Sequence, residues 1–437
     1  MPLVSALRLL VPGARVKRWL ALILPGLICL WVGLAFLRRG EPLDILKPAV
    51  ALVRWADARW PALLDSDWGS VALGLPLALG GMALIGYGLW RATSSFAGRD
   101  LAPHSVRTWV GAVVRSRQLS QGPRVAVIGG GTGLSTMLRG LKQHTSNIVA
   151  IVTVTDDGGS SGKLQRQLNI PPPGDIRNCI VALADEESVM TELLQFRFRG
   201  PGAGEGLRDH AVGNLLIAAL AAISGGDFQD AVRKAGRVLN IRGEVFPSTT
   251  ERVTISAEME DGSVIEGETA IAHAHKRIRR IHLSPGDAGA PPEVTEAIKL
   301  ADIVVIGPGS VFTSIIPNLL VRGIPEALAA TRARKVYVCN VMTQPGETDG
   351  FSASDHVKAI AAHVPRPVFD RVIVNTDVPP PELVEKYRQT GSVLVEPDMD
   401  RIRALGYRPM PGSFVSGTDL VRHDPTKLAT AIIRMLS

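Results

Sequence analysis

Two long uncharged apolar segments lie near the start of the chain, and shorter apolar segments recur from residue 125 onward. The first long segment runs from Trp19 to Leu37 and the second from Val71 to Trp90. Each is long enough to cross a bilayer as a helix, which takes roughly 20 apolar residues. Aromatic residues lie near the segment ends, as they do at membrane interfaces. The pattern predicts a transmembrane hairpin over residues 1–91, with spans at about 19–37 and 71–90.

The charges that flank these segments predict their orientation. Basic residues precede the first segment and follow the second, whereas the loop between them mixes basic and acidic residues. This distribution favours cytoplasmic placement of both termini, hence a multi-pass protein of the inner membrane with a cytoplasmic C-terminal domain. A secretory signal peptide is the alternative for the first segment, but the second segment and the lack of a small-residue cleavage site argue against it. Residues 92–121 carry several Arg and few acidic residues and are predicted to be a basic cytoplasmic linker.

Short apolar segments separated by polar, glycine-rich stretches make up residues 122–437. The segments at 125–128, 148–155 and 301–306 are almost wholly apolar, which is typical of parallel strands buried on both faces. We therefore predict an α/β fold with a Rossmann-like, doubly wound and mostly parallel sheet. Residues 251–283 differ, because apolar and polar positions alternate and Asp261-Gly262 supplies a hairpin turn. We predict a β-rich insertion there.

Glycines follow the first predicted strand of this domain at positions 129, 130, 131 and 133. Glycines allow a phosphate to approach the backbone, and the helix that follows offers free N–H groups and a positive dipole end. The dinucleotide fingerprint is incomplete because Leu134 stands where Gly or Ala is needed, and a Walker A loop is absent. The sequence thus favours a phosphorylated ligand, with an ordinary tight turn as the alternative.

Polar side chains follow other predicted strands and open predicted helices. Asp156 and Asp157 follow the second strand, where a carboxylate can bind ribose or a hydrated Mg²⁺ that bridges phosphates. A solvated loop with a helix-capping Asp is the alternative. Asn214 opens an apolar helix and can bond a base or sugar, and Ser310 can donate its hydroxyl to an anion.

Motifs spread along the chain, in the family's order, resemble the gluconeogenesis factor family, whose bacterial members are also described as cell-shape factors. The motifs are GGGTGLS (129–135), TDDGGSSG (155–162), PPPGDIRN (171–178), GNLLIAAL (213–220), GPGS (307–310) with TSIIPNLL (313–320), and NVMTQPGET (340–348). The similarity covers about residues 122–430 and places the chain within the wider 2-phospho-L-lactate transferase superfamily.

The resemblance implies a cleft that recognises a UDP-sugar, above all UDP-N-acetylglucosamine, and a link to cell-wall precursor supply and cell shape during gluconeogenic growth. By similarity, the ligand-binding residues are Gly130, Gly131, Thr132, Gly133, Asp156, Asp157, Asn178, Asn214, Ser310 and Asn340. No firm cofactor or metal is implied, although Mg²⁺ on Asp156 and Asp157 is a candidate. Expected partners are a nucleotide sugar, the membrane and cell-envelope enzymes, and the chain is a candidate homo-oligomer.

Two functional hypotheses stay open at this point. In the first, the protein is a membrane-tethered regulator that binds a UDP-sugar without turnover. In the second, it is a Mg²⁺-dependent transferase that moves a phospholactyl-type group from a nucleoside diphosphate-linked donor to a deazaflavin precursor, with Asp156 and Asp157 as catalytic candidates. The net charge of +7 comes partly from the basic flank, and no nucleic-acid-binding motif is present. The three cysteines have no CxxC or zinc-type spacing, so neither a disulfide framework nor a metal finger is expected.

Overall fold

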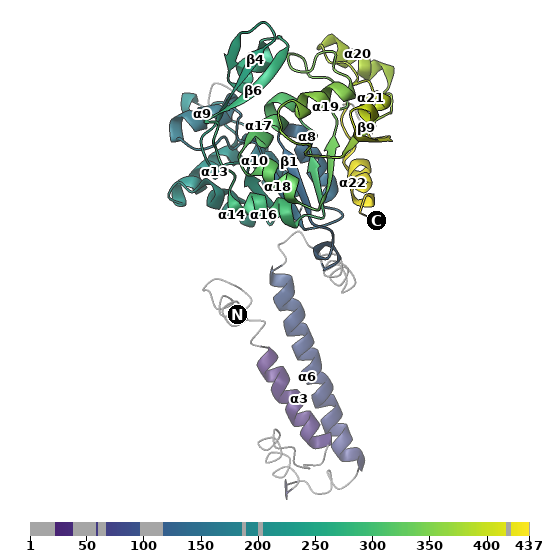
Figure 1. The fold of residues 1–437 in the computed structure, drawn as a ribbon. Helices are drawn as coiled ribbons and strands as arrows, with labels where there is room; N and C mark the ends of the chain where they lie inside the picture. The colour runs from purple at the N-terminus through teal and green to yellow at the C-terminus, as the bar shows by residue number, and fades with distance from the viewer. Residues whose placement is uncertain are drawn as a thin grey trace. The chain divides into compact units, whose positions relative to one another are not determined.

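The structure, a computed structural model, describes residues 22–37, 58–59, 67–96, 117–185, 189–199, 204–416 and 421–436. The chain divides into two compact units, Met1–Ala112 and Val113–Ser437. Figure 1 shows the first unit as a helical hairpin and the second as an α/β domain. The division falls within the segment that the sequence predicts to be a linker, of which residues 97–116 lie outside the described part of the chain.

The first unit contains helices α3 (Ile23–Leu37) and α6 (Asp67–Phe96), which pack against each other. Glycines form the contact: a β-carbon on Gly33 would lie 2.5 Å from the Ala78 nitrogen, and one on Gly81 would lie 2.5 Å from the Leu30 nitrogen. Such close backbone approach is characteristic of small-residue helix interfaces in membranes. In the part that the structure describes, α6 alone contains a segment long and apolar enough to span a bilayer, at Val71–Arg91. Helix α3 is a shorter apolar helix of 15 residues, and positions 19–21 of the predicted first span are not described.

The second unit is built on a seven-stranded sheet in the order β10-β9-β8-β7-β1-β2-β3, in which all neighbouring strands are parallel. The predicted Rossmann-like fold is confirmed. Its strands are β1 (Val125–Gly129), β2 (Ile148–Val152), β3 (Glu244–Pro247), β7 (Ile303–Ile306), β8 (Arg334–Val338), β9 (Arg371–Asn375) and β10 (Arg408–Gly412).

Helices cover both faces of this sheet at its centre, whereas its edge strand β10 contains no buried residue. Every residue of β1 is buried, so both faces of the sheet are covered at this strand. This burial explains why the β1 sequence is apolar throughout and does not alternate with polar residues. The helical elements are α8 (Gly131–Leu141), α9 (Gly159–Leu168), α10 (Gly174–Leu183), α11 (Val189–Gln195), α12 (Gly204–Leu207), α13 (Val212–Ile223), α14 (Phe228–Val238), α16 (Pro292–Leu300), the π-helical turn η4 (Val311–Ile315), α17 (Ile316–Leu320), α18 (Ile324–Ala330), α19 (Ala353–Ala361), α20 (Pro381–Gln389), α21 (Met399–Ala404) and α22 (Pro425–Arg434).

The predicted β-rich insertion is a three-stranded antiparallel sheet, β4 (Thr254–Met259), β5 (Val264–Glu266) and β6 (Ile278–Ser284), with helix α15 (Glu268–His273) between its last two strands. Figure 1 shows its strands β4 and β6 projecting at one edge of the domain. The alternation read from the sequence matches the structure: β4 buries every second residue, because one face of this sheet packs on the domain. The insertion brings α15 to the edge where the main strands end.

The strand order places a topological switch beside β1. From β1 the chain moves outward through β2 and β3 on one side, and later returns to β7 on the other side before continuing to β8, β9 and β10. In open α/β sheets the connections at such a point diverge and leave a crevice at the carboxyl ends of the two strands. The fold therefore locates the candidate site between the loops that follow β1 and β7.

Candidate functional site

Two glycine-rich loops meet at the switch point. A β-carbon on Gly133 would lie 2.8 Å from the Pro308 carbonyl oxygen, and one on Gly309 would lie 3.1 Å from the Gly130 carbonyl oxygen. The loops thus touch backbone to backbone, a closeness that larger residues would prevent. Gly131 and Gly307 also have positive φ angles of 69° and 78°, which favour glycine at both turns.

A cavity of about 550 Å³ opens beside these loops. This volume is in the range of small-molecule sites. Seven of the residues predicted from the sequence line it: Gly130, Gly131, Thr132, Gly133, Asp156, Ser310 and Asn340. The structure therefore gathers residues that are up to 210 positions apart in the chain on one wall.

The other three predicted residues are not among those that line this cavity. The Asp157 carboxylate accepts hydrogen bonds from the backbone N and the Oγ1 of Thr269, at 3.0 and 2.6 Å, and so holds the start of α15. Asn178 and Asn214 both accept from the guanidinium of Arg177, each at 2.8 Å. Their hydrogen bonds are therefore made within the protein.

Arg177 lies at the centre of a buried polar network. Burial lowers its pKa to about 10, so it stays charged at neutral pH. Asn214 also donates from Nδ2 to Ser160 Oγ at 3.0 Å, and that hydroxyl contacts His210 Nδ1 at 3.1 Å. These bonds join α9, α10 and α13 and give both terminal nitrogens of the buried guanidinium an acceptor, while its Nε has none among the described residues.

Acidic side chains form another part of the cavity wall. Asp175 accepts a hydrogen bond of 2.7 Å from the Gly131 nitrogen, at the start of α8, while burial and the nearby Asp156 raise its pKa to about 6. Glu268, from α15 of the insertion, lines the same cavity. Burial and the negative charges around it, Asp156 foremost, raise the pKa of Glu268 to about 9. At neutral pH the Glu268 carboxyl is therefore protonated and can donate a hydrogen bond.

The hydroxyls beside the second glycine loop are held by a buried carboxylate. Ser310 donates to Glu347, and Thr313 Oγ1 lies 2.8 Å from Ser310 Oγ. Burial raises the pKa of Glu347, against the hydrogen bonds from Ser310 and Thr313. The Glu347 carboxyl fixes the orientation of both hydroxyls at the cavity.

The C-terminal segment adds a cation and an imidazole to the cavity. Arg422 is exposed and is the one Lys or Arg side chain among the lining residues that the structure describes. His423 is buried beside it, hydrogen-bonded to the Cys339 carbonyl, and burial lowers its pKa to about 4. The neighbouring Asn340 brackets the Gly309 backbone, accepting from its nitrogen at 3.2 Å and donating to its oxygen at 2.9 Å. A guanidinium that lines the same cavity as the N-terminus of α8 suits an anionic ligand.

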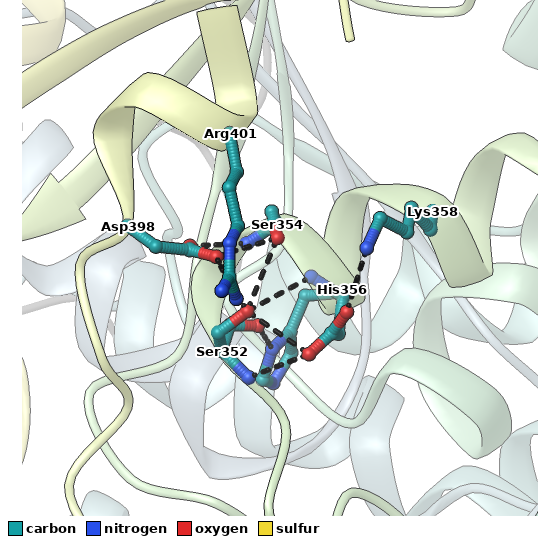
Figure 2. A network of polar contacts seen from close by, with 7 residues as sticks. Ser352, Ser354, His356, Lys358, Asp398 and Arg401 are labelled. Carbon is teal, nitrogen blue, oxygen red and sulfur yellow. Dashed lines mark hydrogen bonds and ion pairs between the residues drawn. The ribbon is translucent and has the colours of Figure 1, made fainter. Parts of the chain in front are cut away.

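Residues with catalytic chemistry also gather where α19 and α21 begin (Figure 2), and none of them is among the residues that line the cavity. Ser352 Oγ donates to Asp398 at 2.8 Å, and Ser354 donates to the same carboxylate from its nitrogen and its Oγ. His356 Nδ1 bonds the Ser352 carbonyl oxygen at 2.8 Å, and its Nε2 has no partner in the described part of the chain. Because no serine hydroxyl meets the imidazole, this is a helix-capping network and not a nucleophilic triad.

Metal binding by side chains alone is not supported by the described residues. They contain no group of three or more His, Cys, Asp or Glu side chains that could hold a metal ion. Asp156 faces the cavity without Asp157, which bonds Thr269. Mg²⁺ commonly takes only one or two carboxylates and completes its shell with ligand phosphates and water, an arrangement that Asp156 fits.

Sequence reasoning missed Asp175, Glu268, Glu347, Arg422 and His423 as residues of the cavity and its support. Asp175 lies inside PPPGDIRN (171–178) and Glu347 inside NVMTQPGET (340–348), so family motifs are the signal that points to both residues. Glu268 follows no apolar strand of the main sheet, and Arg422 and His423 follow no glycine loop. Only the folded arrangement of the insertion and the C-terminal segment brings these three to the site.

Comparisons with known proteins agree with the α/β fold of the second unit. The sequence profile of the family described as 2-phospho-L-lactate transferase CofD matches residues 125–415. A Nostoc sp. protein named "Putative gluconeogenesis factor" is 42% identical over 435 residues, which cover 97% of this chain and 91% of that protein. The Bacillus subtilis protein named "Gluconeogenesis factor" is 45% identical over 319 residues, 73% of this chain and 99% of that protein.

A solved structure from Bacillus halodurans is 45% identical and aligns with a TM-score of 0.68, covering 71% of this chain and 99% of that one. The matches from the two Bacillus species are close in length to the second unit, whereas the Nostoc match also takes in most of the first.

Proposed function

From the premise that this chain belongs to the 2-phospho-L-lactate transferase CofD family, with relatives named gluconeogenesis factors, we propose that it is a membrane-tethered UDP-sugar-binding regulator of carbon metabolism and cell-wall precursor supply. UDP-N-acetylglucosamine is the proposed ligand, and cell shape and cell-envelope enzymes are the proposed targets of regulation. The observation that carries the proposal is the cavity at the switch point, where two glycine loops and Arg422 surround space for a phosphorylated ligand.

The residues that line the cavity suit a ligand that contains both a diphosphate and polar rings. The first turn of α8 supplies N–H groups for phosphate oxygens, and Arg422 supplies positive charge. Asp156 lies at the end of the second strand, where a carboxylate can accept hydrogen bonds from ribose. Gln344 adds an amide that suits a sugar hydroxyl, and Asn340, bonded to both backbone groups of Gly309, holds the second glycine loop in place for the ligand.

The experiment that tests this proposal is a calorimetric titration of the full chain in detergent with UDP-N-acetylglucosamine, followed by an assay for product. Calorimetry is preferred because all seven tryptophans lie within the first 110 residues, outside the α/β domain. Saturable binding without product is the expected result. Absence of binding, at ligand concentrations where the protein remains folded, would reject the UDP-sugar assignment.

The second candidate function is a Mg²⁺-dependent transferase, favoured by the family profile and by Asp156 at the cavity. When bound, Mg²⁺ would neutralise charge on a ligand diphosphate. Asp156 would hold that ion together with the phosphates, while the glycine loop would stabilise developing negative charge. This candidate predicts product from a nucleoside diphosphate-linked phospholactyl donor and a deazaflavin precursor, and loss of that product in Asp156→Asn with the fold retained.

Membrane tethering through two N-terminal helices is part of the proposal. Apolar side chains on the outer surface of the first unit are half-exposed or more, among them Leu24, Ile28, Leu79 and Met82. Side chains of this kind favour lipid over water. The test is extraction of membranes with alkaline carbonate, which should leave the chain in the membrane fraction if the helices are inserted.

A further inference from the structure

Glu268 is the one residue that the inserted subdomain contributes to the cavity wall. It is the first residue of α15 and its side chain is half-buried. Within the described residues no side chain or backbone group forms a hydrogen bond with its carboxyl, whereas the neighbouring carboxylates of Asp156, Asp157, Asp175 and Glu347 each accept at least one. The Glu268 carboxyl is therefore placed at the cavity without a protein partner.

Helix α15 is fixed at both ends by the main domain. At its start, Asp157 accepts two hydrogen bonds from Thr269. Near its end, a β-carbon on Gly346 would clash with the Ala272 carbonyl, so the loop after β8 packs directly on the helix. This clamping fixes the backbone of α15, and therefore the position from which the Glu268 side chain reaches the cavity.

Burial, and after it the negative charges nearby, determines the protonation state of Glu268. Asp156, Asp175 and Glu347 lie close enough to disfavour a further negative charge, and burial acts in the same direction. Ionised carboxylates crowded on one wall would also repel an anionic ligand. A neutral carboxyl instead offers an O–H donor to the ligand and accepts a second hydrogen bond at its carbonyl oxygen.

We infer that Glu268 contacts the bound ligand as a neutral hydrogen-bond donor to a phosphate or sugar oxygen, and that Asp157 is the residue that positions it. The inference rests on the proposed function, because it assigns a role within the same nucleotide-sugar cavity. It gives the insertion a direct part in binding. It also gives Asp157 a role through Thr269 in place of direct ligand or metal contact.

The main test is calorimetric titration of full-chain variants with UDP-N-acetylglucosamine at neutral and alkaline pH. Glu268→Gln keeps a donor and should stay within about threefold of the parent affinity, whereas Glu268→Ala should weaken binding about tenfold, the loss of one buried hydrogen bond. The parent affinity should fall as pH rises through about 9, while that of Glu268→Gln should not. Glu266→Gln, on an exposed neighbouring position of β5, is the matched control and should change neither.

The positioning role of Asp157 is tested by two substitutions. Asp157→Asn keeps an oxygen acceptor for Thr269 and should retain most of the affinity, and Asp157→Ala should lose as much as Glu268→Ala. Equal, full affinity in Glu268→Ala and the parent would overturn the inference while leaving the proposed ligand intact. Thermal melting curves of each variant identify any loss that is due to unfolding.

A measurement without ligand separates this inference from the proposed function. The infrared difference spectrum between the parent and Glu268→Gln at neutral pH should contain the carbonyl band of a protonated carboxyl. If no variant binds UDP-N-acetylglucosamine, the proposed ligand is rejected, and the band then decides the state of Glu268. Its presence supports the neutral donor, and a carboxylate band in its place overturns it.

Discussion

Asn214 illustrates how a residue chosen for a ligand can be engaged within the protein. Its amide oxygen accepts from Arg177 and its amide nitrogen donates to Ser160, and its side chain is buried. Both halves of the amide are thus used inside the protein. The sequence around Asn214, a glycine and then an apolar helix, is the same whether the amide binds a ligand or a buried cation. The local pattern therefore does not distinguish the two.

Asn214→Ala should lower the free energy of unfolding by about 2 kcal/mol, because it leaves a buried guanidinium and a buried hydroxyl short of partners. Urea unfolding of the ligand-free protein, followed by circular dichroism, measures the change. Asn178→Ala is the matched control, since it removes a half-buried bond to the same Arg177 and should cost less. Unchanged stability together with lost binding would instead place Asn214 at the ligand.

His423 should make stability depend on pH. Burial lowers its folded pKa to about 4, below an unfolded value of 6.5, so folding favours the neutral imidazole. The corresponding stability is present above about pH 6.5 and is lost as pH falls toward 4, by about 3 kcal/mol in all.

Urea midpoints measured across this pH range should fall more steeply for the parent than for His423→Gln. Parallel curves for the two proteins would contradict the prediction. The other buried histidines contribute equally to both proteins, so they cancel in the comparison.

At the level of elements, the glycines of α3 and α6 are predicted to determine the packing of the hairpin. Gly81 faces the Leu30 backbone, while a β-carbon on the adjacent Gly80 would meet nothing within 4 Å. Gly81→Leu should therefore separate the helices, and Gly80→Leu should not.

Tryptophan fluorescence reports on this unit and not on the α/β domain, because all seven tryptophans lie within the first 110 residues, with Trp31 on α3 and Trp90 on α6. We expect a shifted emission maximum and a lower melting midpoint for Gly81→Leu in detergent, with Gly80→Leu matching the parent. The same shift in both variants would show that a larger side chain anywhere in this part of α6 changes the emission, whether or not it faces α3.

At the level of the whole molecule, every described residue that lines the cavity belongs to the second unit. A chain that starts near residue 113 should therefore bind UDP-N-acetylglucosamine within about twofold of the full chain, and should move from the membrane fraction to the supernatant. The Bacillus subtilis relative, 99% of which is matched by 73% of this chain, supports the autonomy of this part. Calorimetry and fractionation of the two chains check the prediction, which a large loss of affinity would contradict.

The sequence by itself determined the α/β class, the β-rich insertion and the family. Apolar runs without a polar face predict buried parallel strands, because a strand that is covered on both faces needs apolar residues at every position. Period-two alternation predicts a half-buried antiparallel sheet, because only every second residue faces the core. Glycines that permit a positive φ or a close backbone contact also left a local signal, at Gly131 and Gly307. These features depend on neighbours in the chain.

The tertiary structure alone decided which polar side chains share the cavity. The order β7-β1-β2 joins the loops after β1 and β7, the insertion adds Glu268, and the C-terminal segment adds Arg422 and His423. The same folding directs Asn178 and Asn214 to Arg177 and Asp157 to Thr269. Short-range periodicity contains no information on contacts between segments more than a hundred residues apart, so these assignments required the packed fold.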